Sequence, residues 1–343
     1  MRNLFIIILA LNILVEFSGC SGQNKKDAAD FFLKGNQSLS QKNYAEAIRF
    51  YDEAIAKNAD FSDAYLNKGI TLLKLEQADK AAEVLTEAIK IDPSLVQANL
   101  VRAESMLRLG QLREAAENLK HIEKQYADSS SYHLLKGNLL QAQSEPTQAI
   151  SEYDRAIALD KRNIEAYINR GAVYYALHSY KIAKLDFQSA IVLDPAQPQA
   201  LNNLGLIFMH EQQWSSALSC FDKILNRNPA DAYALNNKGY TLMQTGELAK
   251  AKDLIDKSLE ILPKNGYALR NLGVYYRKSN QNEKALEAFS KAIEIAEPVD
   301  QLYGLTGQTY YDQKKLKEAC EIWKQGVVLK DSISVASAAK YCH

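Results

Sequence analysis

The sequence has no excess of charge of either sign, because its 41 Lys and Arg residues are balanced by 41 Asp and Glu residues. Broad contact with nucleic acid or a membrane surface needs a basic excess, so we exclude nucleic acid as an expected partner. Glycine and proline are sparse, at 15 and 7 residues. No linker or low-complexity stretch interrupts residues 28–333, and we therefore expect one continuous array.

Motifs that carry chemistry are missing as well. The sequence has no Gly-rich phosphate loop, no nucleophile elbow, and no cluster of His, Cys and carboxylate residues at metal-ligand spacing. Its five histidines are scattered along the chain, at His121, His133, His178, His210 and His343. We therefore predict a protein that is not an enzyme and that needs neither a cofactor nor a metal ion.

A period of 34 residues dominates the sequence. Eight glycines follow it, with Ala103 in the one remaining slot: Gly35, Gly69, Gly137, Gly171, Gly205, Gly239, Gly273 and Gly307. An alanine stands 12 residues after each slot, from Ala47 to Ala319, and a large apolar residue follows four residues later, from Tyr51 to Trp323. The i, i+4 spacing places each such pair on one helix face. Each unit is therefore predicted to be a helical hairpin.

The glycine needs a physical reason, since it costs about 1 kcal/mol relative to alanine inside a helix. We expect the glycine of the first helix and the alanine of the second helix to bring the two axes close together. The large apolar residue is then predicted to fill the gap to the next hairpin. A period of this length without insertion indicates a solenoid whose function lies on an extended surface.

These residues resemble the tetratricopeptide repeat. The resemblance rests on stretches such as 65–69 (YLNKG), 167–171 (YINRG) and 201–205 (LNNLG), each followed by the alanine and apolar slots. It implies an all-α protein, a right-handed α-solenoid of about nine hairpins over residues 28–333, with a short tail at 334–343. The third and fourth units depart most from the pattern, because Asn99 and His133 replace a bulky residue four before the glycine slot.

The N-terminus is typical of a secretory signal, with Arg2 before a short apolar run and small residues before Cys20. Ser18, Gly19 and Cys20 resemble a bacterial lipobox, which implies a signal peptide at 1–19 and acyl chains such as palmitate on Cys20. Residues 20–27 would then be the lipidated N-terminus and a short linker. An uncleaved anchor helix is the alternative. We expect a lipoprotein of the bacterial envelope, bound to the lipid bilayer through Cys20, and Ser21 favours the outer membrane facing the periplasm.

The other cysteines are Cys220, Cys320 and Cys342. Cys220 and Cys320 are three units apart, which is too far for a disulfide. Both fall on second helices, where we expect buried free thiols that pack as small hydrophobes. Two disulfide pairings stay open for Cys342, one with Cys320 and one with another chain.

The resemblance implies that first helices line a concave groove. An asparagine stands two residues before the glycine in five units, at Asn67, Asn169, Asn203, Asn237 and Asn271, and Asn202 and Asn236 stand one residue earlier. An amide offers a donor and an acceptor to an extended peptide, and such a ladder resembles that of the O-linked N-acetylglucosamine transferase repeats. Alternatively, these amides only join neighbouring helices. The same face carries Tyr240, Arg270 and Arg277, but the cationic clamp of some three-repeat modules is not matched.

We therefore predict a non-enzymatic protein-interaction module that binds an extended peptide or partner segment in its groove and assembles envelope proteins. The end of the array suggests a rival function. Only ten residues follow the ninth hairpin, so the apolar surface around Tyr303, Tyr310, Tyr311 and Trp323 is expected to stay partly uncovered. Self-association there would make the protein a homodimeric scaffold.

Overall fold

The computed structural model describes residues 22–295 and 298–342, and all regular secondary structure in those residues is helical. The predicted signal peptide and Cys20 lie outside the described residues. Residues 22–40 form the first helix, so residues 22–27, expected to be a linker, are already helical. None of the helices in the described part of the chain is long and apolar enough to cross a membrane.

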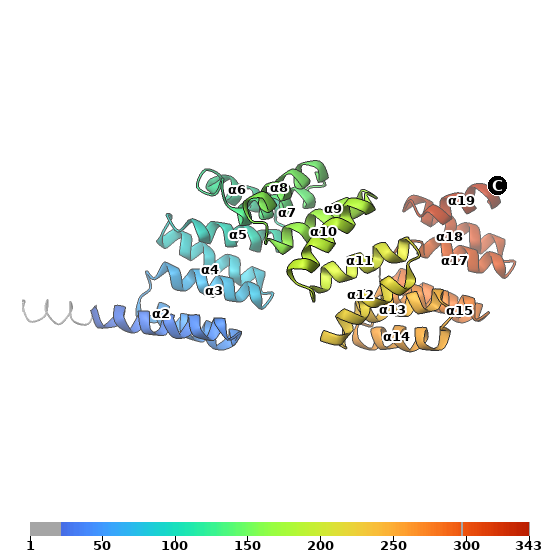
Figure 1. The fold of residues 1–343 in the computed structure, drawn as a ribbon, viewed down its shortest axis with the longest axis horizontal. Coiled ribbons are helices and arrows are strands. Elements are labelled where there is room, and N and C mark those ends of the chain that lie inside the picture. Colours follow the sequence, from blue (N-terminus) through green and yellow to red (C-terminus); the bar gives the residue numbers. More distant parts are fainter. Residues whose placement is uncertain (1–21, 296–297, 343) are drawn as a thin grey trace, which may run out of the picture. The chain divides into compact units, whose positions relative to one another are not determined.

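The chain divides into two compact units, Met1–Val173 and Tyr174–His343, and Figure 1 shows helices following one another as pairs in each. The helices after residue 40 that begin in the first unit are α2 (Tyr44–Lys57), α3 (Ser62–Lys74), α4 (Ala78–Ile91), α5 (Val96–Arg108), α6 (Leu112–Ile122), α7 (Ser130–Ala142), α8 (Pro146–Leu159) and α9 (Ile164–Ala176). Those of the second unit are α10 (Tyr180–Leu193), α11 (Pro198–His210), α12 (Trp214–Arg227), α13 (Ala232–Gln244), α14 (Leu248–Ile261), α15 (Gly266–Lys278), α16 (Asn282–Glu294), α17 (Leu302–Asp312), α18 (Leu316–Val328) and α19 (Ser332–Tyr341).

The turn inside each hairpin is closed by one residue with left-handed backbone, seven residues after the glycine slot. In the first hairpin this residue is Lys42, with φ of 63°. The N–H of Asn43 donates to the carbonyl of Ser38 at 2.9 Å, which is the 6→1 bond of a Schellman motif. Glycine holds the equivalent place at Gly110 and Gly246. The other hairpins carry Glu76, Ser144, His178, Gln212, Asn280 and Lys314 there.

The glycines explain the core of each hairpin. The large apolar residue packs in the same cluster as residues of the following hairpin, as Phe221 does with Ala234. It also lies directly on the glycine of its own hairpin, so that a Cβ on Gly205 would come within 2.7 Å of the Phe221 ring. The same contact joins Gly35 to Tyr51 and Gly137 to Tyr153. The large side chain reaches back toward the first helix because the alanine four residues earlier leaves the two helices close together.

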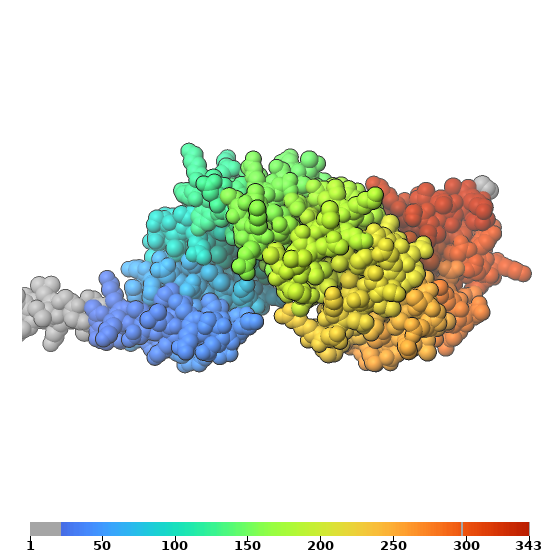
Figure 2. All heavy atoms as spheres, in the orientation of Figure 1, coloured from blue at the N-terminus to red at the C-terminus, as the bar shows by residue number. Residues whose placement is uncertain are grey.

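The first helices of the second unit also contact one another. α11 contacts α13, α13 contacts α15, and α15 contacts α17, whereas no such contact joins α12 to α14 among the described residues. The first helices are thus crowded on one side of this unit, which makes that side its inner face. Side chains fill the spaces between neighbouring ribbons, as the space-filling view in Figure 2 shows.

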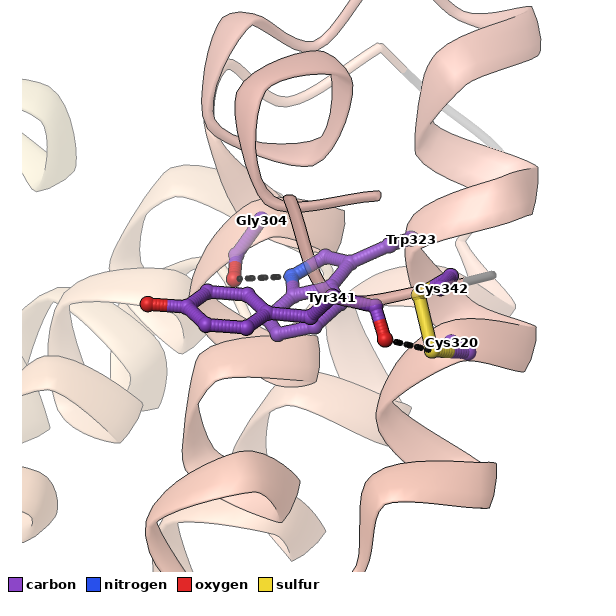
Figure 3. Close-up of a disulfide and its surroundings, with 5 residues drawn as sticks. All are labelled: Gly304, Cys320, Trp323, Tyr341 and Cys342. Carbon is purple, nitrogen blue, oxygen red and sulfur yellow. Dashed lines mark hydrogen bonds between the residues drawn. A yellow bond between two sulfur atoms is a disulfide. The ribbon is translucent and has the colours of Figure 1, made fainter. Parts of the chain in front are cut away.

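The C-terminal residues form a closed cap rather than a loose tail. α19 packs on α17 and α18, and a disulfide joins Cys320 to Cys342 (Figure 3). The Tyr341 ring stacks on Trp323 with centroids 5.9 Å apart, and the indole N–H of Trp323 donates to the Gly304 carbonyl at 3.2 Å. Trp323 is fully buried.

This cap corrects two expectations. Cys320 is not a free thiol, because α19 brings Cys342 beside it, whereas Cys220 is free and buried as predicted. The expected uncovered surface at Trp323 is also wrong, since Tyr341 covers that ring. Other apolar side chains of α18, α19 and their junction are exposed, namely Leu316, Val327, Val328, Leu329 and Val335.

Candidate binding groove

A cavity of about 710 Å³ opens on the first helices of the second unit. Its walls come from the end of α9, from α11, α13 and α15, from the first residues of α10 and α12, and from residues 300–301 before α17. Six of the ten predicted site residues line it together: Asn202, Asn236, Asn237, Tyr240, Arg270 and Asn271. Residues three and four apart share a helix face, which is why α13 presents Asn236, Asn237 and Tyr240 to the same space.

Side-chain caps fix the helices that carry these residues. The Asp231 carboxylate accepts from the N–H of Ala234 at the start of α13, at 2.9 Å. Asn265 does the same for the N–H of Ala268 at the start of α15, at 3.1 Å. Such caps satisfy backbone donors that have no partner within the helix. α13 and α15 therefore begin at defined residues, which sets the register of the polar groups in the cavity.

The amides form a hydrogen-bonded chain across three helices. Asn271 Nδ2 donates to Asn236 Oδ1 at 2.9 Å, Asn236 Nδ2 donates to Asn237 Oδ1 at 3.1 Å, and Asn237 Nδ2 donates to Asn202 Oδ1 at 2.9 Å. Asn236 and Asn271 are each only 2% exposed. These contacts join neighbouring first helices, which is the alternative that we had set beside ligand binding. Amides at the open end of the chain, on Asn202 and Asn237, are half-buried.

Arg270 closes the other end of this chain. Its Nε and Nη2 donate to Asn271 Oδ1 at 3.1 and 2.8 Å, and Nη1 donates to the backbone carbonyl of Asp300 at 3.0 Å. The guanidinium carbon lies 5.7 Å from the ring centre of Tyr240 and 5.4 Å from that of Tyr267. Burial lowers the pKa of Arg270 below its usual range, while the nearby Tyr240 and Asp300 oppose that shift.

Aromatic side chains make up much of the remaining wall. Beyond Tyr240, the cavity is lined by Tyr175, Tyr180, Trp214, Tyr233 and Tyr267, with His178, Met209 and His210. The Tyr180 and His210 rings lie 4.2 Å apart. Tyr233 is 60% and Tyr267 44% exposed, and sequence reasoning missed both. The signal was present, because each stands six residues before its glycine, in the first turn of a first helix.

Four predicted site residues lie outside this cavity. Arg277 is paired with Asp312 at 2.8 Å, and Asn203 is half-buried without lining the cavity. The other two belong to the first unit. Asn67 Nδ2 donates to Asn36 Oδ1 at 2.7 Å, and Asn169 Nδ2 donates to Asn138 Oδ1 at 2.8 Å.

The first-unit amides belong to small, half-buried networks. Asn36 Oδ1 also accepts from the Tyr51 hydroxyl at 2.9 Å, and Asn138 Oδ1 accepts from the Tyr153 hydroxyl at 2.8 Å. Burial raises the pKa of Tyr51 to about 12 and raises that of Tyr153 as well. Each asparagine acceptor thus joins the first helix of the next hairpin to the aromatic residue that covers its own glycine.

No group of three or more His, Cys, Asp or Glu side chains that could hold a metal ion occurs within residues 22–295 and 298–342. Met243 of α13 does not line the cavity and is buried in the core around α13 and α14. The cavity therefore presents amide, aromatic, imidazole and guanidinium groups, and Asp300 also lines it.

Comparison with known proteins agrees with this architecture. Models of the tetratricopeptide repeat match residues 38–94, 72–139 and 231–297, and a TPR repeat model matches 137–177. The chain resembles the Cut9–Hcn1 hetero-tetramer of APC/C with a TM-score of 0.64 at 13% identity, over 92% of this chain and 76% of that one. At that identity the likeness shows the fold alone, and it confirms the predicted α-solenoid class.

Curated relatives match over part of their length. The DnaJ protein P58IPK homolog of Arabidopsis thaliana is 29% identical over 194 residues, which are 53% of this chain and 40% of that protein. The probable UDP-N-acetylglucosamine–peptide N-acetylglucosaminyltransferase SPINDLY of Hordeum vulgare is 24% identical over 172 residues, 47% of this chain and 18% of that protein. This chain thus spans less than half the length of either relative.

The tetratricopeptide fold is generally a non-catalytic interaction scaffold. The repeat models together match more than half of the sequence, and the hairpins, the glycine contacts and the helix order all follow the same 34-residue unit. The chain belongs to the tetratricopeptide repeat family.

Proposed function

We propose that this protein binds an extended peptide or partner segment in the cavity of its second unit. The observation that carries this proposal is the gathering of amides, exposed tyrosines and one guanidinium around about 710 Å³ on the inner face of that unit. Ligand sites are concave, with apolar and aromatic walls and a few polar groups that fix orientation. The cavity has this composition and a volume within the usual range of such sites.

The amide chain narrows the role of each asparagine. Asn236 and Asn271 hold the first helices together, because their amides are buried and bonded to each other. Asn202 Oδ1 accepts a hydrogen bond from Asn237, whereas the side-chain N–H groups of Asn202 donate to no acceptor among the described residues. A ligand carbonyl can accept from this end. We therefore assign contact with the ligand to Asn202, Asn237 and the tyrosines, and support to Asn236 and Asn271.

Binding is tested with the full-length chain in detergent, used as bait for proteins of the solubilised envelope. Tyr233→Ala and Tyr267→Ala remove exposed rings from the cavity wall without touching the amide chain. Val192→Ala is the matched control, because Val192 is 81% exposed on α10 and does not line the cavity. We expect a protein captured by the parent and by the control to be lost from the double tyrosine variant. Equal capture by all three would contradict binding in this cavity.

We also propose that the protein is exported and anchored through an acylated Cys20, with the array facing the periplasm, where it assembles envelope proteins. The disulfide between Cys320 and Cys342 supports export, because disulfides persist mainly in oxidising compartments. Metabolic labelling with palmitate tests the anchor, and Cys20→Ser should abolish both the label and membrane retention. Retention of the unlabelled variant would instead favour an uncleaved anchor helix.

Self-association is the second candidate function. The observation that favours it is the apolar end of α18, where Val328 is 80% and Leu329 61% exposed. Sedimentation over a range of concentrations should then show a dimer that Val328→Glu disrupts. A monomer at every concentration would remove this candidate.

A further inference from the structure

His133 of α7 is a buried polar residue at a position that most hairpins give to a bulky apolar one. It stands four residues before Gly137, where other hairpins carry residues such as Leu201 and Leu235. Its side chain is only 6% exposed. A polar ring in such a place needs hydrogen-bond partners, and both of its nitrogens have one.

Both partners of the imidazole are hydrogen-bond acceptors. Nδ1 lies 2.6 Å from Oε2 of Glu152 on α8, and Nε2 lies 2.9 Å from the backbone carbonyl of Ala127. A carbonyl can only accept, so Nε2 carries a proton. An ionised carboxylate also only accepts, so the contact with Glu152 needs a second proton between Nδ1 and Oε2. The pair therefore holds one proton more than a neutral imidazole beside a carboxylate.

The charged groups around the pair favour the proton on the imidazole. Glu152 Oε1 pairs with Nζ of Lys136 at 3.4 Å and with Nη1 of Arg155 at 3.9 Å, and both cations stabilise the ionised carboxylate. Lys136 pairs in addition with Glu123, directly after α6, at 3.1 Å. Tyr132 adds a neutral ring, whose centre lies 5.3 Å from that of the imidazole. The pair is therefore an imidazolium beside a carboxylate.

The imidazolium joins α8 to an irregular connection. α6 ends at Ile122 after 11 residues, whereas α4 and α8 each have 14, and residues 123–129 form a series of turns before α7. The Ala127 carbonyl, within these turns, accepts from Nε2 of His133. The ring thus links the end of the third hairpin to the second helix of the fourth.

Loss of one proton would break this link on one side. Histidine changes charge between about pH 5 and 8, and a cavity of about 340 Å³ lined by His133 lets the proton leave to water. A neutral ring keeps one N–H, which stays with the Glu152 carboxylate because charge-assisted hydrogen bonds are stronger. Nε2 then faces the Ala127 carbonyl as a second acceptor, and the two repel each other.

The same helix lines a cavity of the first unit. This cavity, of about 520 Å³, has Leu100 and Leu107 of α5 and Leu134 and Leu135 of α7 in its wall, so it lies on the junction between those two helices. Leu134 follows His133 directly in the chain. Release of residues 123–129 therefore loosens the helix that forms one side of this cavity.

We propose that His133 is a pH-sensitive clamp. At low pH the imidazolium fastens residues 123–129 to α8, and at higher pH its deprotonation releases them and loosens the junction of the third and fourth hairpins. The stabilisation is complete while the proton is bound and is lost as the pH rises. The clamp lies in the first unit and does not depend on ligand binding in the second unit.

Hydrogen–deuterium exchange of the full-length chain in detergent, at about pH 5.5 and about pH 8.5, brackets the histidine range. Rates are corrected for the intrinsic pH dependence of amide exchange. Residues 123–133 should exchange at least about tenfold faster at the higher pH, because a buried hydrogen bond is lost. Residues 225–235, which carry Leu235 in the place of His133, are the internal control and should change less than about threefold.

Two variants separate the clamp from a histidine with a structural role alone. In Glu152→Gln the new amide N–H can donate to Nδ1 of a neutral ring, so Nε2 keeps its proton for Ala127 and exchange should stay slow at both pH values. The double variant His133→Leu and Glu152→Leu copies Leu235 and Leu254, which hold the same two positions in the seventh hairpin. Its residues 123–133 should exchange at one corrected rate at both pH values.

Equal corrected rates for residues 123–133 of the parent protein at the two pH values would overturn the clamp. A full pH response in either variant would also overturn it, since another group would then be titrating. If a variant fails to fold, nitrogen-15 spectra of the histidine-labelled parent protein decide. A buried imidazole that loses its proton at the midpoint pH of the exchange change supports the clamp, and a different midpoint contradicts it.

Discussion

The role of the buried amide chain leads to a quantitative prediction at Asn271. Its Oδ1 accepts two hydrogen bonds from Arg270, and its Nδ2 donates one to Asn236. Asn271→Ala removes all three bonds in a residue that is 2% exposed. The guanidinium edge and the Asn236 carbonyl oxygen then lose their partners on the inner face of α13 and α15.

The expected cost follows from the groups left unpaired. A buried polar group without a partner costs about 1 to 3 kcal/mol, and more when it is charged. Water in the neighbouring cavity can reach part of the guanidinium, which reduces the penalty. We therefore expect a loss of about 3 kcal/mol in the local free energy of opening of α13 and α15, which corresponds to roughly 100-fold faster amide exchange.

Hydrogen–deuterium exchange with mass spectrometry is the suitable assay, because repeat arrays do not unfold as one two-state unit. Asn203→Ala is the control. Asn203 occupies the equivalent slot of α11, is half-buried and makes no side-chain hydrogen bond within the described residues. Its exchange should change less than about fivefold. An equally small change in amide exchange for Asn271→Ala would refute the structural role of the amide chain. Ligand binding would then be the better explanation for its asparagines.

Three further predictions concern the hairpins and the cap. Burial raises the pKa of Tyr51 to about 12, above its value near 10 in the unfolded chain, so the stabilising contribution of the neutral phenol is complete below pH 10 and disappears between about pH 10 and 12. The melting temperature of Tyr51→Phe should therefore fall less steeply over that pH range than that of the parent protein. Parallel curves for the two proteins would contradict this. Cys342→Ser removes a disulfide that spans 22 residues, which the chain-entropy estimate values at about 3 kcal/mol. Limited proteolysis should then release α19 from Cys342→Ser but not from the control Cys220→Ser. Equal resistance of the two variants would show that packing alone holds the cap. Gly273→Ala places a Cβ against the buried Phe289 ring. Overpacking should lower the free energy of unfolding by about 1 to 3 kcal/mol, offset by about 1 kcal/mol of better helix propensity. In urea unfolding the double variant with Phe289→Leu should recover stability, and a further loss of stability would contradict the contact.

The fold could be predicted because the information for it is local. Each hairpin contacts little beyond its neighbours, so a residue pattern that repeats every 34 positions specifies how each hairpin forms and stacks on the next. The contact of the large apolar residue with the glycine of its own hairpin was nevertheless not predicted. The sequence places Phe221 on the same helix face as Ala217, and only the helix spacing shows that this face covers Gly205.

Features outside the repeat could not be predicted in the same way. α19 has no glycine slot, so nothing in the period places Cys342 beside Cys320. The amide chain shows a different limit. The asparagine two residues before the glycine finds its acceptor at different repeat positions in the two units. In the first unit Asn67 donates to Asn36, and in the second unit Asn237 donates to Asn202. The choice depends on which neighbouring side chain offers an acceptor.

The candidate site was predicted in part. The ladder and Arg270 were found because they stand at fixed offsets from the glycines, and six of ten residues do line one cavity. Whether Arg270 has an acidic partner depends on residues 30 positions away, around Asp300. Sequence spacing does not report such pairing, and this is why Arg277 was grouped with Arg270 although it is neutralised by Asp312.

The left-handed turns have a consequence for protein engineering. A side chain in that conformation costs about 1 to 2 kcal/mol, and glycine avoids the penalty at the expense of roughly 0.5 to 1 kcal/mol of chain entropy. Five of the turns inside hairpins lie away from the cavity and carry neither glycine nor asparagine, at Lys42, Glu76, Ser144, Gln212 and Lys314. Since the repeats contribute almost additively, glycine at these five positions would raise the thermal resistance of the array in small independent steps. The natural chain is therefore less stable than its fold allows, and these substitutions can increase its thermal stability without altering any residue of the cavity.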